Sequence, residues 1–466
     1  MTHRFHPSVL REYDIRGTFG TTLGPDDAYA LGRSFGTRVV RSGDRNAAAK
    51  CVAVGRDGRV SSPALEEALV AGLCAAGVHV VQIGVGPTPM LYYAAASLPE
   101  VQGGIQITGS HNPPDQNGFK MVLHGSAFFG PDIVDLGHLA VSGDWEVGNG
   151  TARPAQILEA YVDRLLCGLE GIDPSLLEDL AIGWDAGNGA AGTVIERLTA
   201  KLPGQHTLLH TQIDGMFPNH HPDPSVDANL ADLRRAVARG RLDFGLAFDG
   251  DGDRIGVVDA TGRALAGDQL LMLFAEDMLK RQPGATVIAD IKASSALFAR
   301  IAALGGEPLM WKTGHSLIKS KMKETGALLA GEMTGHVFFA DDYYGFDDAL
   351  YAAVRLMAAT VRLGRSVTQL CDAMPALINT PELRFPVEEA RKFAVIEEVR
   401  GRLAAEGADV VTIDGLRVTT PAGWWLLRAS NTESMLTARA ESDSETGLAA
   451  LLAALDAQLA ASGLSR

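Results

Sequence analysis

Short apolar runs recur along most of the chain, and each one ends in a glycine-rich or polar loop. We predict strands at 51–55, 104–107, 180–184, 244–248, 285–290 and 327–330. Helical patterns follow these runs, and strands that alternate with helices are typical of parallel α/β units. Because ligands of such units bind beyond the carboxyl ends of the strands, we expect the chemistry of this protein in the loops that follow them.

The C-terminal part of the chain has a different pattern. A charged helix is predicted over about 387–406, and short strands are predicted at 409–413, 416–420 and 424–427. The pair Asp414-Gly415 between two of these strands is typical of a hairpin turn. A closing helix carries leucines on one face, at positions 448, 451, 452, 455 and 459. These elements predict a smaller α+β domain.

The fold class predicted from these patterns is α/β, with three related α/β domains plus a smaller C-terminal α+β domain around a central cleft. A chain of 466 residues is too long for one ordinary core, so several domains are expected. We predict domains at 1–154, 155–257, 258–369 and 370–466. The loops that follow the strands would then face one shared cleft.

Composition and charge narrow the possible functions. Hydrophobic residues make up 46% and charged residues 21%, a composition typical of soluble globular proteins. No apolar run is long enough to span a membrane, and the N-terminus lacks the apolar stretch of a secretory signal, so we expect a cytoplasmic protein. A formal net charge of -15 argues against a nucleic-acid partner. Any phosphate-binding site must therefore concentrate positive charge locally.

The run DGDGDR at 249–254 carries the strongest chemical signal. On an extended segment residues two apart point the same way, so three carboxylates are expected to converge. Hard oxygen donors of this kind suit Mg2+. A calcium EF-hand loop also begins with alternating aspartates, but it needs glycine and glutamate at places where this chain has Arg254 and Ala260. We therefore predict a magnesium site.

A second run, TGSHNPP at 108–114, follows the strand predicted at 104–107. Its prolines stiffen the loop by fixing φ, and His111 adds a polar group beside Ser110. Lys120 follows at a distance that allows its side chain to return to the same site. A serine fixed in position beside a lysine and a metal cluster is what reversible phosphoryl storage requires.

Three weaker runs are informative only together with these two. In GEMTGH at 331–336, Glu332 and Thr334 lie two residues apart and are suited to grip adjacent sugar hydroxyls. The run RASNTE at 428–433 groups a guanidinium with hydroxyls, an amide and backbone N–H groups, which suits a phosphate dianion. The run REYDIRG at 11–17 lies near the N-terminus.

Together the five motifs resemble the α-D-phosphohexomutase family, and closely its bacterial phosphomannomutase/phosphoglucomutase branch. The matching motifs are REYDIRG, TGSHNPP, DGDGDR, GEMTGH and RASNT. They occur in the family's order, and the resemblance covers essentially the whole chain. It implies three α/β domains and a smaller, mobile C-terminal domain around a central cleft. Thr334 departs from the serine of many relatives but keeps the hydroxyl.

The resemblance implies roles for the motif residues. Ser110 matches the serine that carries the catalytic phosphate. The magnesium ligands match Asp249, Asp251 and Asp253, and an oxygen of the phosphoserine completes the set. The sugar-binding pair matches Glu332 and Thr334. The loop that holds the substrate's non-reacting phosphate matches Arg428, Ser430, Asn431 and Thr432.

Further residues match positions that line the cleft of the family. They are Tyr13, Arg16, His111, Lys120, Arg254, Lys292, His315 and His336. Among them Lys120 and His336 are the leading candidates for proton transfer, followed by His315. The spacing of these residues leaves open which of the three reaches the reacting hydroxyl.

The function implied is reversible phosphoryl transfer between the 1- and 6-positions of glucose and/or mannose phosphates, through phosphoserine and a 1,6-bisphosphate. Mg2+ and glucose 1,6-bisphosphate as activator are the expected cofactors, and hexose phosphates are the expected partners of a monomer or weak dimer. The alternatives are a phosphoglucosamine mutase, a phosphosugar-binding protein without catalysis and a phosphatase. A phosphatase would release inorganic phosphate, which distinguishes it from a mutase.

Overall fold

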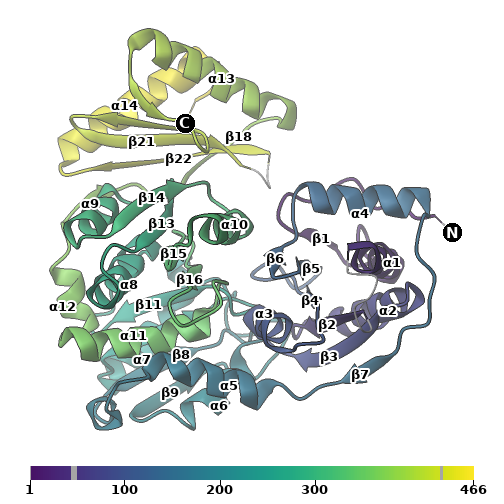
Figure 1. The fold of residues 1–466 in the computed structure, drawn as a ribbon. Coiled ribbons are helices and arrows are strands. Elements are labelled where there is room, and N and C mark those ends of the chain that lie inside the picture. The colour runs from purple at the N-terminus through teal and green to yellow at the C-terminus, as the bar shows by residue number, and fades with distance from the viewer. Residues whose placement is uncertain (1, 43–49, 431–433, 466) are drawn as a thin grey trace.

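The structure is a computed structural model that describes residues 2–42, 50–430 and 434–465. Within these residues the chain forms four β-sheets, three of which are flanked by helices in α/β domains (Figure 1). The fourth sheet, with helices α13 and α14, forms the smaller C-terminal domain at the top of Figure 1. The predicted fold class is therefore confirmed.

The first sheet contains the strand order β1-β5-β4-β2-β3-β7, with β6 paired to β5. The strands are β1 (Ile15–Thr18), β2 (Cys51–Arg56), β3 (His79–Val85), β4 (Gly103–Ile107), β5 (Gln116–Leu123), β6 (Ser126–Ala127) and β7 (Ala152–Pro154). Its helices are α1 (Pro25–Ser42), α2 (Ser62–Ala75), α3 (Thr88–Ser97) and α4 (Pro131–Ser142). Helices α1 and α2 approach closely because Gly32 and Gly72 lie at their contact, where a Cβ would overlap the opposite backbone.

The second sheet has the order β12-β11-β10-β8-β9. Its strands are β8 (Ala181–Asp185), β9 (Gln205–Leu209), β10 (Phe244–Phe248), β11 (Ile255–Asp259) and β12 (Ala264–Leu265). The neighbouring helices are α5 (Leu158–Leu166), α6 (Gly192–Thr199) and α7 (Ala231–Gly240). Short 3-10 turns occur at Cys167–Leu169, Pro174–Leu177 and Asp227–Leu230.

The third sheet has the order β14-β13-β15-β16. Its strands are β13 (Thr286–Asp290), β14 (Glu307–Trp311), β15 (Leu329–Gly331) and β16 (Val337–Phe339). Its helices are α8 (Gly267–Arg281), α9 (Ser295–Ala303), α10 (His315–Thr325), α11 (Ala349–Leu363) and α12 (Val367–Asp372).

The three α/β domains repeat one strand order, although their residues show no such repeat. In each, three parallel strands are followed by an antiparallel fourth: β3-β2-β4 with β5, β9-β8-β10 with β11, and β14-β13-β15 with β16. The reversal between the third and fourth strands produces a tight loop at the carboxyl end of a parallel strand. These three loops contain Ser110, the aspartate cluster and Glu332.

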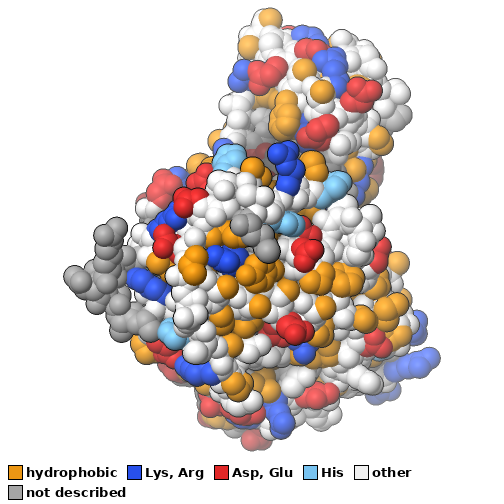
Figure 2. Space-filling view, turned by 90° about the vertical axis from the view of Figure 1, so that its right-hand side faces the viewer, with side chains coloured by type: hydrophobic (Ala, Val, Ile, Leu, Met, Phe, Trp, Pro, Cys, Tyr) orange, Lys and Arg blue, Asp and Glu red, His pale blue; other side chains and the backbone are white. Residues whose placement is uncertain are grey.

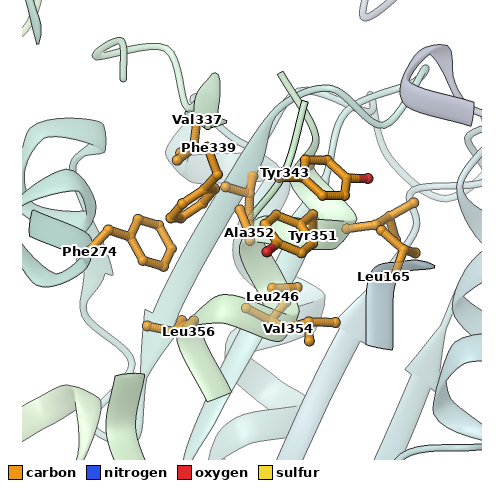
Figure 3. Packing of buried hydrophobic residues seen from close by; sticks show 14 of the residues in the cluster. Leu165, Leu246, Phe274, Val337, Phe339, Tyr343, Tyr351, Ala352, Val354 and Leu356 are labelled. Atoms are coloured by element: carbon orange, nitrogen blue, oxygen red, sulfur yellow. The ribbon is translucent and has the colours of Figure 1, made fainter. Parts of the chain in front are cut away.

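One hydrophobic cluster runs through the three α/β domains. It joins residues of α3, the β8–β10 sheet, α8 and the β13–β16 sheet, and it includes more than half of the residues of α11. Figure 3 shows Phe339 between Phe274 and Tyr351, with Tyr343 beside Tyr351. The ring centroids of Phe339 lie 5.1 Å from Phe274 and 5.5 Å from Tyr351, both in edge contacts. The three domains therefore share packing and form one body, which we call the three-domain body.

The C-terminal domain has a core of its own. Its sheet has the order β17-β22-β21-β20-β19, with β18 paired to β22. The elements are β17 (Ile378–Asn379), β18 (Leu383–Pro386), α13 (Glu389–Glu406), β19 (Asp409–Val411), β20 (Leu416–Thr420), β21 (Gly423–Ala429), β22 (Met435–Ser442) and α14 (Glu445–Ala461). On α14, Leu451, Leu455 and Leu459 are buried in this core, as the sequence pattern predicted.

None of the helices in the described part of the chain is long and apolar enough to cross a membrane. Figure 2 shows one face of the molecule, on which charged side chains of both signs are interspersed, with the C-terminal domain as the narrower lobe above.

Candidate functional site

Ser110 lies in the tight loop between β4 and β5 and adopts a left-handed backbone, with φ of 50°. A residue other than glycine pays a conformational cost there, so the surroundings must hold it in place. Its own N–H donates to the Thr108 Oγ1, at 2.8 Å. Its side chain is almost fully buried, at 1% exposure. The loop thus presents one hydroxyl in one direction.

Arg59, which is absent from the sequence-based candidates, is the residue that holds this loop. Its buried guanidinium donates to the backbone carbonyls of Ser110, Asn112, Pro113 and Gln116. Asp57 positions the guanidinium through a 3.1 Å ion pair and also accepts from the Gly109 N–H. Both residues follow β2 directly. The rule that chemistry lies beyond the carboxyl ends of strands could have pointed to them.

The Ser110 hydroxyl points at the aspartate cluster. Its Oγ donates to Asp249 Oδ2 at 2.9 Å and lies 3.1 Å from His111 Nδ1. Burial, together with the charges of Arg254 and Arg16, holds the pKa of His111 well below its usual value. The neutral imidazole then donates its Nδ1 hydrogen to the serine oxygen.

The predicted convergence of Asp249, Asp251 and Asp253 is present, with ligand oxygens within 4.8 Å of one another. The geometry differs from the extended segment that we predicted. Residues 249–254 form a tight turn after β10, in which Gly252 has a φ of 73°. The turn folds the carboxylates together because glycine permits the left-handed backbone.

The donor set of this turn fits a hard divalent cation. Asp251 Oδ1 and Asp253 Oδ1 are buried without a hydrogen-bond partner. Burial and the charges of Asp251 and Asp253 raise the pKa of Asp249 well above its usual value. Like charges this close in a buried site are unfavourable unless a cation compensates them. The cluster is therefore suited to hold Mg2+.

Lys120, on β5, returns to the aspartate cluster as predicted. Its ammonium lies 2.8 Å from Asp251 Oδ2 and also contacts Asp253 Oδ2. Burial alone would lower the pKa of Lys120, but the charges of Asp251 and Asp253 raise it above its usual value. Lys120 is therefore a cation held between two of the carboxylates.

A buried network extends from the cluster into the third domain. Arg254 donates through Nε to His336 Nε2 at 3.0 Å, and His336 Nδ1 lies 3.1 Å from Asp347 Oδ2. His315 stacks on His336, with ring centroids 5.3 Å apart, and its Nδ1 lies 3.4 Å from Asp347. Lys319 pairs with the other Asp347 oxygen at 2.9 Å.

Asp347 and Lys319 were absent from the sequence-based candidates. Asp347 lies between β16 and α11, away from the motif loops, and nothing in its spacing distinguishes it. Burial and the Lys319 charge lower the pKa of His315. Although burial opposes it, the Lys319 charge also keeps the pKa of Asp347 well below its usual value. The two histidines thus share one ionised carboxylate.

Glu332 and Thr334 come together in the third loop, with Thr334 Oγ1 3.4 Å from Glu332 Oε2. Glu332 Oε1 accepts from the Gly314 N–H at 2.5 Å, at the start of α10. Tyr13, from the first domain, reaches the same place and donates to the Thr313 carbonyl at 3.1 Å. A tight turn, rather than an extended loop, brings the pair together.

The C-terminal domain contributes Arg428 at the end of β21. Its Nη2 donates to Asp414 Oδ2 at 3.0 Å, and the same oxygen accepts from the Thr313 N–H. Asp414 was predicted only as a turn residue, but it joins the two domains here. Ser430 is buried, and its carbonyl accepts from Lys392 at 2.7 Å. Two further predicted residues, Asn431 and Thr432, lie outside the described residues.

The two remaining candidates lie at the edges of the site. Arg16 donates to Asn112 Oδ1 at 2.8 Å and pairs with Asp14 at 2.5 Å, so it contacts the Ser110 loop. Lys292 follows β13, with Nζ 3.7 Å from Asp290 and 3.8 Å from Glu382.

These contacts form one continuous path through all four domains. The path runs from Ser110 to Asp249, and through Arg254 and His336 to Glu332, whose Oε2 is 4.0 Å from His336 Nε2. It continues through Gly314, Thr313 and Asp414 to Arg428. The site therefore combines a buried hydroxyl, a cation-binding turn, a carboxylate–hydroxyl pair and an arginine from the fourth domain.

A fold of three such α/β domains and a fourth domain, with this site, is characteristic of sugar-phosphate mutases. Family models of phosphoglucomutase/phosphomannomutase match the chain four times. Alpha/beta/alpha domains I, II and III match residues 8–135, 159–262 and 266–377, and the C-terminal domain matches 382–458. The chain belongs to the phosphoglucomutase/phosphomannomutase family.

Individual relatives are similar over nearly the whole chain. A phosphomannomutase/phosphoglucomutase of Pseudomonas aeruginosa is 45% identical over 441 residues, 95% of this chain and 93% of the relative. A crystal structure of a phosphoglucomutase/phosphomannomutase family protein from Burkholderia thailandensis has 43% identity and a TM-score of 0.91, and the match covers 98% of both chains. An Aspergillus fumigatus N-acetylphosphoglucosamine mutase, solved with glucose 1,6-bisphosphate, shares the fold alone, at 13% identity and a TM-score of 0.60 over 99% of this chain and 97% of its own.

Proposed function

We propose that this protein is a phosphohexose mutase that moves phosphate reversibly between the 1- and 6-positions of glucose and mannose phosphates. The observation that carries the proposal is the hydrogen bond from the Ser110 hydroxyl to Asp249, 139 residues further along the chain. It brings a strained, rigidly held nucleophile against a cation-binding cluster, which is the arrangement that phosphoryl storage needs.

In the proposed cycle, a hydroxyl of the sugar phosphate attacks the phosphorus of phospho-Ser110. The new P–O bond forms while the bond from phosphorus to Ser110 Oγ breaks, and the hydroxyl proton passes to a base. The product is a sugar 1,6-bisphosphate. After it turns end for end, Ser110 Oγ attacks the other phosphate, and the proton returns to the leaving sugar oxygen. Phosphoryl transfer of this kind depends on positioning and charge stabilisation.

Mg2+ held by Asp249, Asp251, Asp253 and a phosphoserine oxygen would supply charge stabilisation at the transferring phosphate. The chain adds Arg16, Lys120 and Arg254, whose positive charges lie around Ser110 and the aspartate cluster despite the net charge of -15. Lys120 pairs with Oδ2 of Asp251 and of Asp253, which leaves the Oδ1 atom of each aspartate for the ion.

Lys120 and His336 are the proposed proton carriers, with His315 as the third candidate. His336 uses Nε2 to accept from Arg254 and presents Nδ1 to Asp347, so Asp347 orients the ring. Lys120 is a cation in this arrangement and serves as an acid before it can serve as a base. Both residues lie within the network that joins the Ser110 loop to the sugar-binding loop.

The remaining residues would bind the substrate. Glu332 and Thr334 would grip two sugar hydroxyls, and Arg428 would hold the phosphate that does not react, with Tyr13 and Lys292 at the rim. Ser430, Asn431 and Thr432 complete the proposed phosphate loop. Glucose 1,6-bisphosphate, which is bound in the Aspergillus structure, would act as the activator that phosphorylates Ser110. We propose a cytoplasmic monomer or weak dimer.

A coupled assay tests the proposal. We expect conversion of glucose 1-phosphate and mannose 1-phosphate to the 6-phosphates, dependent on Mg2+ and a trace of glucose 1,6-bisphosphate, with almost no release of inorganic phosphate. Higher rates on glucosamine 1-phosphate would favour the phosphoglucosamine mutase instead.

The variant Ser110→Ala should lose turnover by about 10³-fold or more, since the phosphate carrier is gone. Ser142→Ala, a serine at the exposed end of α4, is the matched control and should retain full activity. Near-normal turnover of Ser110→Ala would refute the phosphoserine mechanism.

A further inference from the structure

A second cluster of metal-binding side chains lies in the second domain, apart from the catalytic residues. Asp185 ends β8, His210 follows β9, and His220 lies in the long loop that leads to α7. Ligand atoms of these three side chains lie within 4.8 Å of one another. None of the three has a part in the proposed phosphoryl transfer.

The contacts of His220 direct its Nε2 at a carboxylate. Its Nδ1 lies 3.0 Å from the His221 carbonyl, which only accepts hydrogen bonds, so Nδ1 carries the hydrogen. In the neutral ring Nε2 is then an acceptor, and it faces the Asp185 oxygens at 3.0 and 3.2 Å. Two acceptors this close require a cation between them or a second hydrogen on the ring. The contact to a backbone carbonyl is typical of metal-binding histidines.

His210 has the complementary arrangement. Its Nε2 lies 3.0 Å from Asp232 Oδ2, so the neutral ring donates to this carboxylate and Nδ1 keeps its lone pair. A carboxylate behind a histidine is the second recurrent partner of metal-bound imidazoles. The side chains of His210 and His220 are 18% and 15% exposed, which leaves an ion a route from solvent.

The loops that carry these residues are tied together before any ion binds. Asn188 donates from its N–H to the His210 carbonyl at 2.8 Å and from its side chain to the Gln212 carbonyl at 2.8 Å. The Asn219 amide donates to the Asn188 side-chain oxygen at 2.7 Å, next to His220. A site held in this way loses little entropy when an ion orders its ligands.

We propose that Asp185, His210 and His220 bind a divalent transition-metal ion of the zinc type, with Asp232 as the positioning residue of His210. Two imidazoles and one carboxylate suit Zn2+, whereas Mg2+ prefers oxygen ligands throughout. Binding at zinc-to-nitrogen distances of about 2.0–2.1 Å would draw these ligand atoms, which lie within 4.8 Å of one another, closer together.

The ion would stabilise the support of the catalytic turn. The Pro222 carbonyl, two residues after His220, accepts from the Gly250 N–H at 3.1 Å, between two of the catalytic aspartates. A Cβ on Gly187, two residues after Asp185, would lie 3.1 Å from Pro222 Cβ, so the two loops already touch. Cross-linking them through an ion would restrict the base on which residues 249–253 lie.

The test uses the full chain, stripped with a chelator and then held in excess Mg2+ so that the catalytic cluster is occupied. Zn2+ is added in competition with a chromophoric zinc indicator. We expect one zinc ion per chain and a raised melting temperature. The variants His210→Asn and His220→Gln should each lose at least about 10-fold in zinc affinity, and Asp232→Asn about 10–100-fold. Asparagine tolerates the left-handed backbone of His210, so this variant should fold and keep its turnover with Mg2+.

Two controls separate this site from others. His138→Gln, an exposed histidine on α4, should bind zinc as the parent protein does. Asp251→Asn alters the catalytic cluster and should also retain the zinc ion. Binding that Asp251→Asn abolishes but His210→Asn and His220→Gln leave unchanged would overturn the proposal. Absence of zinc binding in excess Mg2+ would overturn it as well.

Discussion

The three-domain body and the C-terminal domain are held together in different ways. In the body, one hydrophobic cluster crosses the domain borders, and most residues of α11 are buried in it. The C-terminal domain has a separate core and meets the third domain through a small cluster of Ile291, Trp424 and Leu426. We therefore expect the body to behave as one unit and the C-terminal domain to be able to move against it.

Besides this small apolar cluster, hydrogen bonds from two arginines join the C-terminal domain to the third domain. Arg417 donates to the carbonyls of Ile291 and Ala293, at 2.6 and 2.7 Å, and stacks on Trp424. Arg439 donates to the Lys292 carbonyl between them, at 2.9 Å. Each such bond contributes only about 0.5–1.5 kcal/mol net, because its groups bind water once the domains separate, so the C-terminal domain can separate at moderate cost. Arg428 would then move with the C-terminal domain when substrate binds, while Ser110 and the aspartates stay in place in the three-domain body.

The largest expected effect is the loss of unfolding free energy when a buried ring is removed from one of the two hydrophobic cores. Phe339→Ala removes a buried ring from the shared cluster and should cost about 3–5 kcal/mol of unfolding free energy. Phe385→Ala, in the C-terminal core, is the matched variant. Calorimetry should show Phe339→Ala lowering the transition of the body and Phe385→Ala lowering a separate transition. One transition that both variants shift equally would contradict the comparison.

Arg428→Ala should come next. Loss of a guanidinium that holds the non-reacting phosphate should raise KM by about 10–100-fold, because hydrogen bonds to charged groups contribute about 1.5–3 kcal/mol. We expect kcat to change little, since the chemistry lies on the body. Steady-state kinetics measures both constants. Arg400→Ala, which changes an exposed arginine on α13, is the control. A fall in kcat of Arg428→Ala as large as the rise in its KM would count against this division of roles.

Arg417→Met sharpens the comparison at the border itself. It keeps the stem of the side chain and removes two hydrogen bonds, which should weaken docking of the C-terminal domain by about 2 kcal/mol. Hydrogen exchange should become faster at residues 291–293 and 424–426. Arg402→Met, whose bonds stay within the C-terminal domain, should leave these segments unchanged. Unchanged exchange in Arg417→Met would show that apolar contacts alone hold the border.

The smallest effect concerns pH and the body core. Burial raises the pKa of Asp348 from 3.8 to about 6, so its ionised form destabilises the fold. The stabilisation that the protonated carboxyl group provides is complete below about pH 4, and it is lost as the pH rises through 6. Asp348→Asn removes this pH dependence. Between pH 5 and 7.5, the unfolding free energy of the parent should therefore fall by about 1 kcal/mol more than that of the variant. Urea unfolding at both pH values measures this, and parallel pH profiles would show that Asp348 is ionised without cost.

The sequence predicted much of the fold and the composition of the site. The strands, the hairpin at Asp414 and the helix with its leucine face are present, and Ser110 lies beside the aspartate cluster. The extended geometry predicted for residues 249–253 was wrong, because the glycines allow a turn. The domain boundaries and the roles of individual residues stay predictions.

Other features had no local signal. Arg59 holds the Ser110 loop from 51 residues away, and Asp347 joins two histidines from a segment without a motif. The common strand order of the three α/β domains also left no visible repeat in the residues. The order of strands in a sheet depends on which apolar faces pack together, and many different apolar residues can form the same face.

By itself, the sequence determined the kinds of chemical group and the local turns that present them, because glycine, proline and side-chain chemistry act within a few residues. Only the tertiary structure decided which loops meet and which groups are charged. It buries Lys120 between Asp251 and Asp253, more than 130 residues away, and leaves Asp249 with a raised pKa. The physical reason is that burial and distant charges set the energy of an ionised group, and both arise from packing rather than from spacing along the chain.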